Sequence, residues 1–518
     1  MSAVGTSPVP PTENAAHSEE LREAAAHGIR WSAIARPTTE FIQLGSMVVL
    51  ARLIVPAEFG RFAIALIAQQ VAYLIVAGGL SAALVQRKTL DRAHVQTGMA
   101  LALLLGLALA GLTLIGAWTV ISPIFGGRTA MYVALMAPLC LVSALNAVPS
   151  STLSRQMKFR RLSEIEMLNT LARVAVAIGF ALVGLEGEAL VIGLISGSVL
   201  AAAAAWVSAP PPMPRLDRRA ARELMDYGLP TSLAAITWVG FSNVDYVIIG
   251  ARLGALQTGF YFRAYTLAVE YQNKVSVVMT QVGFPVLSRA SSAADLDHLR
   301  HEMVRLLTIV LFPLLVLLAI TAPTVVPLLF GPGWGPAVTP VQILALGGAS
   351  TLVINAVGTV LMATGRPRAL LGFGVAHFTA YALTVILVVP LGIVAVAIDA
   401  AVVHTAFLLV SYRLMLRDSA VRALRTLWDD IAPATVSCLG LAGVALPASM
   451  VLTAAHVPSL VYLAVLAIVT AAPYLLTLRF CFPDTWRTQR AVMGRIVPAR
   501  LRGLRIRGQS RVADSYSA

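Results

Sequence analysis

Residues 47–60 read MVVLARLIVPAEFG, and residues 247–259 read VIIGARLGALQTG. Each stretch places an apolar run before Ala-Arg-Leu, and each then reaches a glycine, Gly60 in the first and Gly259 in the second. The recurrence of an arginine at the same place in two apolar segments indicates an internal repeat, because self-similarity along a chain is the signature of a repeated structural unit.

The composition is that of a membrane protein. Of the 518 residues, 58% are hydrophobic and 12% are charged, whereas a soluble globular protein carries roughly 25% charged residues. Apolar runs long enough to cross a bilayer recur from end to end, so we expect an all-α polytopic protein with about 14 transmembrane helices. The expected spans are residues 31–54, 61–85, 96–121, 130–152, 164–184, 188–208, 226–250, 257–284, 303–326, 337–363, 369–389, 392–414, 430–453 and 458–480.

The arginines and lysines set the orientation of these spans. The loops after even-numbered spans and the two terminal segments hold most of the 39 cations, whereas the odd-numbered loops hold only Arg52, Arg61, Arg128 and Arg252. Because short cytoplasmic loops carry the excess of Lys and Arg, we expect a bacterial inner-membrane protein with both termini in the cytoplasm. The formal net charge of +14 is then a topology signal and no indication of nucleic-acid binding.

The two terminal segments are polar. Residues 484–518 contain the basic stretch RIVPARLRGLRIRGQSR, and such a cluster beside a membrane attracts anionic lipid head groups at about 1 kcal/mol per residue. The alternative is a topology signal that binds nothing. Residues 1–30 have no apolar core, so we expect a disordered cytoplasmic tail there and no cleavable signal peptide.

Several classes of membrane protein do not fit the sequence. The loops are short and leave no room for an extramembrane catalytic domain, so we expect no enzyme. An ATP-driven pump needs a phosphate-binding loop with a Gly-Lys pair, but no lysine follows a glycine. The three cysteines are far apart and lack metal-ligand spacing, so we expect no metal and no cofactor. A secondary transporter or a facilitator remains.

The two Ala-Arg-Leu segments lie six predicted spans apart. An even offset gives two halves of the same orientation, which are parallel repeats related by an axis along the membrane normal. We expect one six-helix half over residues 31–208 and another over 226–416, joined by a cytoplasmic linker at 209–225. Residues 430–480 would add two helices outside the repeat.

Six stretches carry a family resemblance, and the one with Gly-Pro-Gly-Trp between two spans is the most distinctive. They are ARLIVPAEFGRFAIA (51–65), GGLSAALVQRKTLD (78–91), DYGLPTSLAA (226–235), DYVIIGARLGALQTGFYFRAYTLA (245–268), FPVLSRA (284–290) and LLFGPGWGPAVTPVQILALGG (328–348). The chain resembles the Wzx-type polysaccharide and oligosaccharide flippases of the multidrug/oligosaccharidyl-lipid/polysaccharide exporter superfamily. Spans 1–2 and 7–10 carry the resemblance, whereas spans 11–14 match only in hydropathy.

The resemblance implies two six-helix bundles that face each other in a V, with two appended helices. It also implies a polyprenyl-pyrophosphate-linked oligosaccharide as cargo, moved to the outer leaflet by alternating access for cell-surface polysaccharide assembly. A polysaccharide polymerase and glycosyltransferases would be partners. Three alternatives stay open: a peptidoglycan lipid-precursor flippase, a drug exporter of the same superfamily, and a non-transporting scaffold for synthesis enzymes. A drug exporter predicts an acidic cavity for cationic cargo, whereas we expect the cavity of this protein to be net cationic.

Span 8 carries the most informative charges. Four polar residues follow one another at intervals of 7, 4 and 7 residues: Arg263, Glu270, Lys274 and Gln281. At about 100° per residue they fall within roughly 40° of one another, and such a stripe must face protein or water. We expect the two cations and the glutamine to bind the cargo and the glutamate to carry a coupling ion. The alternative is an ion pair of Glu270 with Lys274 inside the bundle.

Three further arginines are candidates for cargo binding, because arginine pairs with phosphate bidentately. Arg52 and Arg252 would lie at the outer ends of spans 1 and 7, where the alternative role is to anchor a helix end. Arg173 lies inside span 5, where the alternative is a side chain that reaches back to the interface.

Further ionisable residues within the spans are candidates to carry a coupling proton or sodium ion: Glu40, Asp245, Asp399 and His404. Asp399 and His404 are five residues apart, about 140° around a helix, so we do not expect them to form one local pair. For His404, as for His377, the alternative is a hydrogen-bonded packing residue.

Overall fold

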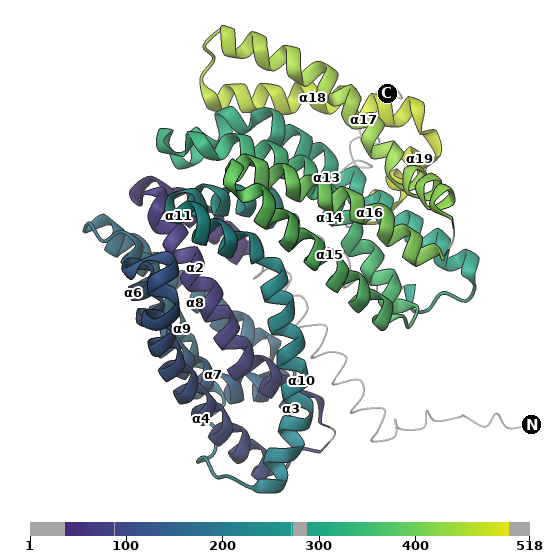
Figure 1. The fold of residues 1–518 in the computed structure, drawn as a ribbon. Coiled ribbons are helices and arrows are strands. Elements are labelled where there is room, and N and C mark those ends of the chain that lie inside the picture. The colour runs from purple at the N-terminus through teal and green to yellow at the C-terminus, as the bar shows by residue number, and fades with distance from the viewer. Residues whose placement is uncertain (1–36, 88, 271, 273–286, 418, 497–518) are drawn as a thin grey trace, which may run out of the picture. The chain divides into compact units, whose positions relative to one another are not determined.

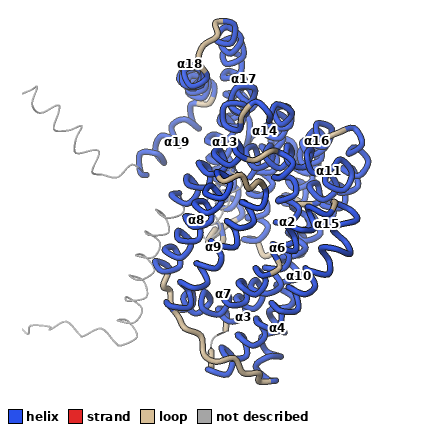
Figure 2. The backbone as a smooth tube through the Cα atoms, turned by 90° about the vertical axis from the view of Figure 1, so that its left-hand side faces the viewer, coloured by secondary structure: helices blue, strands red, loops and turns tan. Residues whose placement is uncertain are grey.

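The structure is a computed structural model that describes residues 37–87, 89–270, 272, 287–417 and 419–496. Over these ranges every regular element is helical and no strand occurs (Figures 1 and 2). The all-α prediction is therefore confirmed. The chain divides into two compact units, and each unit combines segments that are distant in sequence.

The first unit comprises Met1–Arg263 with two later segments, Leu329–Pro336 and Val385–Ile393. Its described part begins with a helix over residues 37–53. The elements that follow are α2 (Pro56–Tyr73), η1 (Leu74–Gly78), α3 (Gly79–Gln86), α4 (Arg92–Gly116), η2 (Ala117–Ile121), α5 (Ser122–Phe125), α6 (Gly127–Met136), α7 (Pro138–Arg155), α8 (Phe159–Leu182), α9 (Gly187–Ser208), α10 (Arg218–Ser242) and most of α11 (Val244–Tyr265). The later segments contain most of η4 (Pro332–Ala337) and all of η5 (Val389–Leu391).

The second unit comprises Ala264–Leu328, Ala337–Thr384 and Val394–Ala518. It contains η3 (Thr266–Glu270), most of α13 (Ala293–Phe330), α14 (Val338–Ala363), most of α15 (Pro367–Val388), all but the first residue of α16 (Ile393–Leu416), α17 (Ala420–Ala454), α18 (Ser459–Cys481) and α19 (Pro483–Ile496). The units divide the chain after Arg263 and not at the predicted linker, and the division into two six-helix halves stays a prediction.

Eleven helices in the described ranges are long and apolar enough to cross a membrane, and they match predicted spans 2 to 6 and 9 to 14. They are Pro56–Gln86, Arg92–Phe125, Gly127–Arg155, Phe159–Leu182, Gly187–Ser208, Ala294–Phe330, Pro332–Ala363, Arg368–Leu391, Ile393–Leu416, Ala420–Ala454 and Ser459–Cys481. Predicted spans 1 and 8 extend into residues that the structure does not describe, and span 7 is interrupted at Asn243, between α10 and α11. The chain is a multi-pass membrane protein, and the total of fourteen spans stays a prediction.

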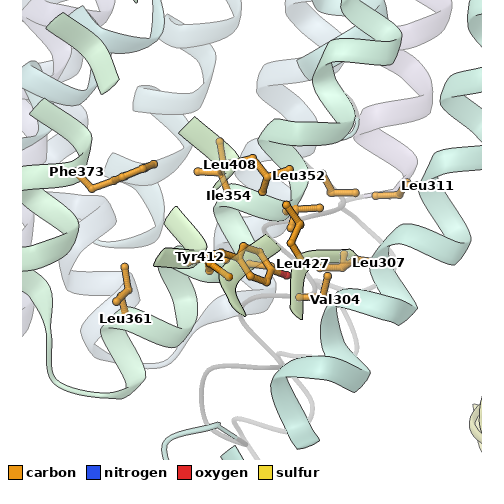
Figure 3. Close-up of a cluster of buried hydrophobic side chains, with 14 residues drawn as sticks. Val304, Leu307, Leu311, Leu352, Ile354, Leu361, Phe373, Leu408, Tyr412 and Leu427 are labelled. Carbon is orange, nitrogen blue, oxygen red and sulfur yellow. The ribbon is translucent and has the colours of Figure 1, made fainter. Parts of the chain in front are cut away.

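The core of the second unit is a cluster of buried side chains from α13 to α17 (Figure 3). Val304 of α13, Leu352 of α14 and Tyr412 of α16 are fully buried in it, and Leu427 of α17 is 7% exposed. The hydroxyl of Tyr474 on α18 donates a hydrogen bond of 2.7 Å to the Ile309 carbonyl on α13. The two helices after the predicted repeat therefore both pack against α13 of this unit.

Helix α10 packs against the π-helical segment η1 in the first unit. The hydroxyl of Ser232 donates to the Leu74 carbonyl at 2.9 Å and accepts from the Gly79 amide at 3.1 Å. A π-helical turn disturbs the regular backbone ladder, and buried backbone groups need partners. Ser232 supplies both partners from a neighbouring helix.

Candidate functional site: the repeat segments and the charged residues

The second repeat segment is a helical hairpin. Helix α11 bends at Gly254, whose φ of 81° and ψ of 178° are non-helical and are readily adopted by glycine. The ring centroids of Tyr246 and Tyr261 lie 5.8 Å apart, whereas 15 residues of straight helix would separate them by about 22 Å. The chain therefore reverses at Gly254, between the predicted spans 7 and 8.

The two repeat segments meet at their glycines. A Cβ atom on Gly60 would lie 1.9 Å from the Ala255 carbonyl oxygen, and one on Gly259 would lie 1.8 Å from the Pro56 carbonyl oxygen. Pro56 and Ala255 are equivalent positions, because each stands four residues before its own glycine. The contact is thus reciprocal, with a local two-fold relation between the segments. We call this contact the glycine crossing.

A buried indole packs beside the glycine crossing. Trp334 is 2% exposed, and its Nε1 donates a hydrogen bond of 2.9 Å to the Ala51 carbonyl. Its ring centroid lies 5.5, 6.0 and 5.6 Å from those of Phe59, Phe260 and Phe330, respectively. The Gly-Pro-Gly-Trp stretch therefore places an aromatic side chain against the ends of both repeat segments.

The two repeat arginines differ in their contacts. Arg52 is exposed and donates from Nε to the Leu329 carbonyl at 3.2 Å. Leu329 lies in the last turn of α13, where the final carbonyls lack helical partners and a cation is favourable. Arg252 is also exposed, and it makes no hydrogen bond or ion pair within the described part of the chain. The anchoring role predicted as the alternative fits Arg52, and cargo contact stays a prediction for both.

Arg263 is a buried cation at the end of the second hairpin. It is 8% exposed, and its guanidinium carbon lies 3.9 Å from the ring centroid of Phe59. A desolvated contact of this kind contributes about 2 kcal/mol. Glu270 is half-buried at the end of η3, and Lys274 and Gln281 lie outside the described residues. The structure therefore describes the start of the predicted polar face of span 8, at Arg263, and the face as a whole stays a prediction.

Asp245 holds the two arms of the hairpin together. The carboxylate is 2% exposed and accepts from the Tyr246 amide at 2.9 Å and from the Tyr261 hydroxyl at 3.1 Å. Buried polar groups are stable when they are hydrogen-bonded. These bonds give Asp245 a structural role, and its predicted role in ion coupling stays a prediction.

Two other predicted residues are half-buried. Arg173 lies on α8, which packs closely against α9, and Glu40 lies on the helix over residues 37–53. Both take part in polar contacts. Cargo binding by Arg173 and ion coupling by Glu40 stay predictions.

Glu58 is a buried carboxylate that the sequence pattern did not single out. It is 1% exposed, pairs with Arg61 and with Arg128 at 3.2 Å, and accepts from the Tyr132 hydroxyl. Arg128 also pairs with Glu186 at 3.0 Å. Two of the four cations in the predicted outer loops therefore have carboxylate partners. The spacing of Glu58 and Arg61 at i,i+3 is a usable signal, whereas the partner on α6 cannot be read from local sequence.

Asp430 is a second buried carboxylate without a sequence signal, and it lies in the second unit. It is fully buried on α17 and pairs with Arg300 and His301 of α13. It also accepts a hydrogen bond of 2.6 Å from Tyr412 of α16. A buried carboxylate needs such partners, and here they join three helices.

Asp399 and His404 both face α15. The Thr384 hydroxyl donates to Asp399 at 2.9 Å, and the ring of His404 lies 4.9 Å from that of His377 and 5.2 Å from that of Tyr381. The prediction that Asp399 and His404 do not pair locally agrees with these contacts, since each has partners on the neighbouring helix.

A solvated network lies outside the spans, where α10 begins. Glu223 accepts hydrogen bonds from His94 at 3.0 Å and from Arg219 at 3.0 Å, and it pairs with Arg87 at 2.7 Å. Hydrogen bonds from His94, Arg219 and Arg87, in this order of effect, lower the pKa of Glu223 to about 2. The carboxylate is therefore ionised at neutral pH and connects α10 to the loop before α4.

Residues 49–339 match the family of polysaccharide biosynthesis proteins. This range contains the first repeat segment from Val49 on, the whole second repeat segment, the glycine crossing and Trp334. The chain belongs to this family. The resemblance to Wzx-type flippases is thereby confirmed.

Two curated relatives show the level of similarity. The lipopolysaccharide biosynthesis protein WzxC of Escherichia coli (strain K12) is 26% identical over 359 residues, which cover 67% of this chain and 71% of the relative. The teichuronic acid biosynthesis protein TuaB of Bacillus subtilis (strain 168) is 24% identical over 355 residues, which cover 65% of this chain and 71% of the relative.

Solved structures show that this family member shares a transporter fold. The lipid II flippase MurJ in an inward closed conformation is similar with a TM-score of 0.68 at 14% identity, over 88% of this chain and 99% of that one. An inward-facing multidrug resistance MATE family transporter is similar with a TM-score of 0.59 at 13% identity, over 75% of this chain and 95% of that one. At these identities the likeness concerns the fold alone.

The family match ends at residue 339, before α15 and α16. Asp399, His404 and Asp430 therefore lie outside the matched range, whereas Arg52, Arg252 and Arg263 lie inside it.

Proposed function

We propose that this member of the polysaccharide biosynthesis family is a flippase for a polyprenyl-pyrophosphate-linked oligosaccharide. The cargo moves from the cytoplasmic to the outer leaflet of a bacterial inner membrane, and both termini of the protein are cytoplasmic. The observation that carries the proposal is the family match over residues 49–339, and the fold shared with a lipid II flippase supports it.

Intramembrane cations supply the recognition chemistry in this proposal. A pyrophosphate carries at least two negative charges and needs compensation in a low-dielectric site, which arginine gives as a fork of donors and lysine as a point charge. Arg263 lies inside the first unit, against the ring of Phe59, and Lys274 and Gln281 continue the same predicted face. In the transport cycle the phosphate replaces the aromatic ring as the partner of Arg263.

The remaining arginines extend the path. Arg252 and Arg52 meet the head group near the outer side, and Arg173 offers a further contact in the first unit. The lipid tail stays in the bilayer while the head group crosses by alternating access. The polymerase and glycosyltransferases that use the flipped cargo are the functional partners.

The test is transport by purified protein in liposomes that contain a fluorescent lipid-linked oligosaccharide. The rate of appearance of the sugar in the other leaflet is compared between wild type and the double variant Arg263→Ala, Lys274→Ala. We expect the double variant to lose at least about tenfold in rate, because two charge-assisted contacts are removed. The control is Arg160→Ala, which removes an exposed cation paired with Glu164 at 2.9 Å.

Full activity of the double variant would refute the assignment of the cations. A wild type that moves no lipid-linked sugar would refute the flippase itself. Loss of polysaccharide export on deletion of 484–518, with no effect of the double variant, would favour the scaffold instead.

A further inference from the structure

A row of polar side chains lies between α15 and α16, which run side by side in the second unit (Figure 1). The Thr384 hydroxyl donates to Asp399 at 2.9 Å. Farther along, the ring of His404 lies 5.2 Å from that of Tyr381 and 4.9 Å from that of His377. Both helices belong to candidate membrane spans of 24 residues, where ionisable side chains are costly and usually functional.

The row is polar at one end and aromatic at the other. Beyond His377 come Phe407, stacked on His377 at 4.6 Å, and Phe373, 5.8 Å from Phe407. Asp399 lies about 9 Å from the start of α16 and His404 about 17 Å, at 1.5 Å per residue. In a hydrocarbon core of about 30 Å, the ionisable groups extend from near one surface to the middle.

The hydrogen bonds define which nitrogen of His404 is basic. Its Nδ1 is bonded to the Ala400 carbonyl, and a carbonyl oxygen can only accept, so Nδ1 carries the hydrogen and Nε2 is free to take a proton. The Nε2 atom of His377 is buried without a hydrogen-bond partner among the described residues. Two imidazole nitrogens in one row can therefore bind a proton.

Asp399 is the third proton acceptor. Within the described ranges no lysine or arginine pairs with it, and the Thr384 hydroxyl is its hydrogen-bond donor. A carboxylate in a spanning helix without a cationic partner is stabilised when it binds a proton. Helix α14 packs on the other side of α16, where Gly347 meets Ala401, and its sequence contains no ionisable residue.

We propose that Asp399, His404 and His377 form a proton-binding row that takes up protons from the outer side and couples the proton gradient to transport. This inference rests on the proposed function and its topology, which place the Asp399 end of the row outward. The phenylalanines close the opposite end, so a bound proton stays until the helices rearrange. An inward-moving proton is thereby exchanged for an outward-moving cargo.

The test compares flipping rates in liposomes with and without a pH gradient that is acid on the outer side of the protein. Two variants remove different members of the row, Asp399→Asn and His404→Gln. The control is Ser350→Ala, which removes a hydroxyl bonded to Thr405 at 2.9 Å between α14 and α16. We expect the pH gradient to accelerate flipping by the wild type and by the control. In each row variant we expect the flipping rate with the gradient to equal the rate without it. A wild type that does not respond to the gradient, or two row variants that respond as wild type does, would overturn the proposal.

A second measurement needs no cargo. Infrared difference spectra between about pH 5 and pH 8 record protonation of carboxyl and imidazole groups. We expect a carboxyl band in wild type that Asp399→Asn lacks, and imidazole bands that His404→Gln reduces. Identical spectra for wild type and both variants would overturn the proton-binding row. The expected bands in a wild type that moves no lipid-linked sugar would support the row while refuting the flippase.

Discussion

The two copies of the Ala-Arg-Leu segment share a sequence landmark but differ in what surrounds them. In the first copy, the Ala51 carbonyl accepts the indole of Trp334 and Arg52 bonds to the Leu329 carbonyl. In the second copy, Arg252 is exposed and has no such bond among the described residues. The backbone crossing is symmetric, whereas the side-chain contacts are not.

This difference separates two kinds of constraint. The glycine crossing depends on both copies equally, because each glycine faces the carbonyl of the other segment. The buried Glu58 belongs to the first copy alone, and Gln257 occupies the equivalent position in the second. The first copy is therefore an anchored helix end, and the contacts that the two arginines offer to the head group are not equivalent.

The largest expected effect comes from the indole that anchors the first copy. Trp334→Ala removes a buried ring and the hydrogen bond to the Ala51 carbonyl. We expect the free energy of unfolding to fall by about 3–5 kcal/mol. The measurement is thermal unfolding in detergent. Trp118→Ala is the control, since Trp118 is 56% exposed. Similar losses for the two variants would contradict the role of Trp334.

A substitution at either glycine should destabilise the glycine crossing to the same extent. Gly60→Ala and Gly259→Ala each place a methyl group against a backbone carbonyl that cannot rotate away, and we expect about 3 kcal/mol of destabilisation for each, at the upper end of overpacking costs. Gly45→Ala is the control on the helix over residues 37–53, since nothing lies within 4 Å of its Cβ position. It should be neutral or stabilising by about 1 kcal/mol. Clearly unequal effects at Gly60 and Gly259 would disprove the reciprocity.

Glu58 of the first copy can be replaced by glutamine, the residue at the equivalent position of the second copy. Glu58→Gln leaves Arg61 and Arg128 without their buried partner, and we expect a loss of about 2 kcal/mol, less than for a fully buried pair because Arg128 is partly solvated. Glu188→Gln is the control, because Glu188 meets Arg128 only at 3.5 Å. If the free energy of unfolding of Glu58→Gln equalled that of wild type, the two copies would tolerate the same residue at this position.

The smallest effect concerns the two arginines. Arg52→Ala loses the exposed hydrogen bond to the Leu329 carbonyl at a helix end, and we expect the free energy of unfolding to fall by about 0.5–1 kcal/mol. Arg252→Ala should leave stability unchanged. Equal stability of the two variants with equal losses of flipping would restore the symmetric phosphate contacts.

Periodicity and charge predicted much of the fold. Apolar length predicted eleven spans that the structure reproduces, and the loop between spans 7 and 8 falls on the turn at Gly254. These features are local, so a window of sequence contains them. The predicted total of fourteen goes beyond the described residues, because spans 1 and 8 extend outside them.

The candidate site was less accessible to sequence reasoning. Asp399 was expected from its place in a span, but its partner Thr384 comes from another helix, and helical angles within α16 cannot reveal it. Asp430 and Glu58 are buried by partners on other helices, 130 residues away in the case of Arg300. Such pairs depend on how helices pack, and a single sequence holds no record of that packing.

The hydrogen bond between Ala51 and Trp334 also concerns the order in which the protein is made. The two residues are 283 positions apart. At about 5–20 residues per second a ribosome needs roughly 15–60 s to cover that distance. During this interval the helix over residues 37–53 has one carbonyl whose indole partner is not yet made, and Gly60 gains its opposing backbone only with Ala255, 195 residues later. The first copy therefore completes its contacts only after the second copy and the later segment with Trp334 have both been synthesised.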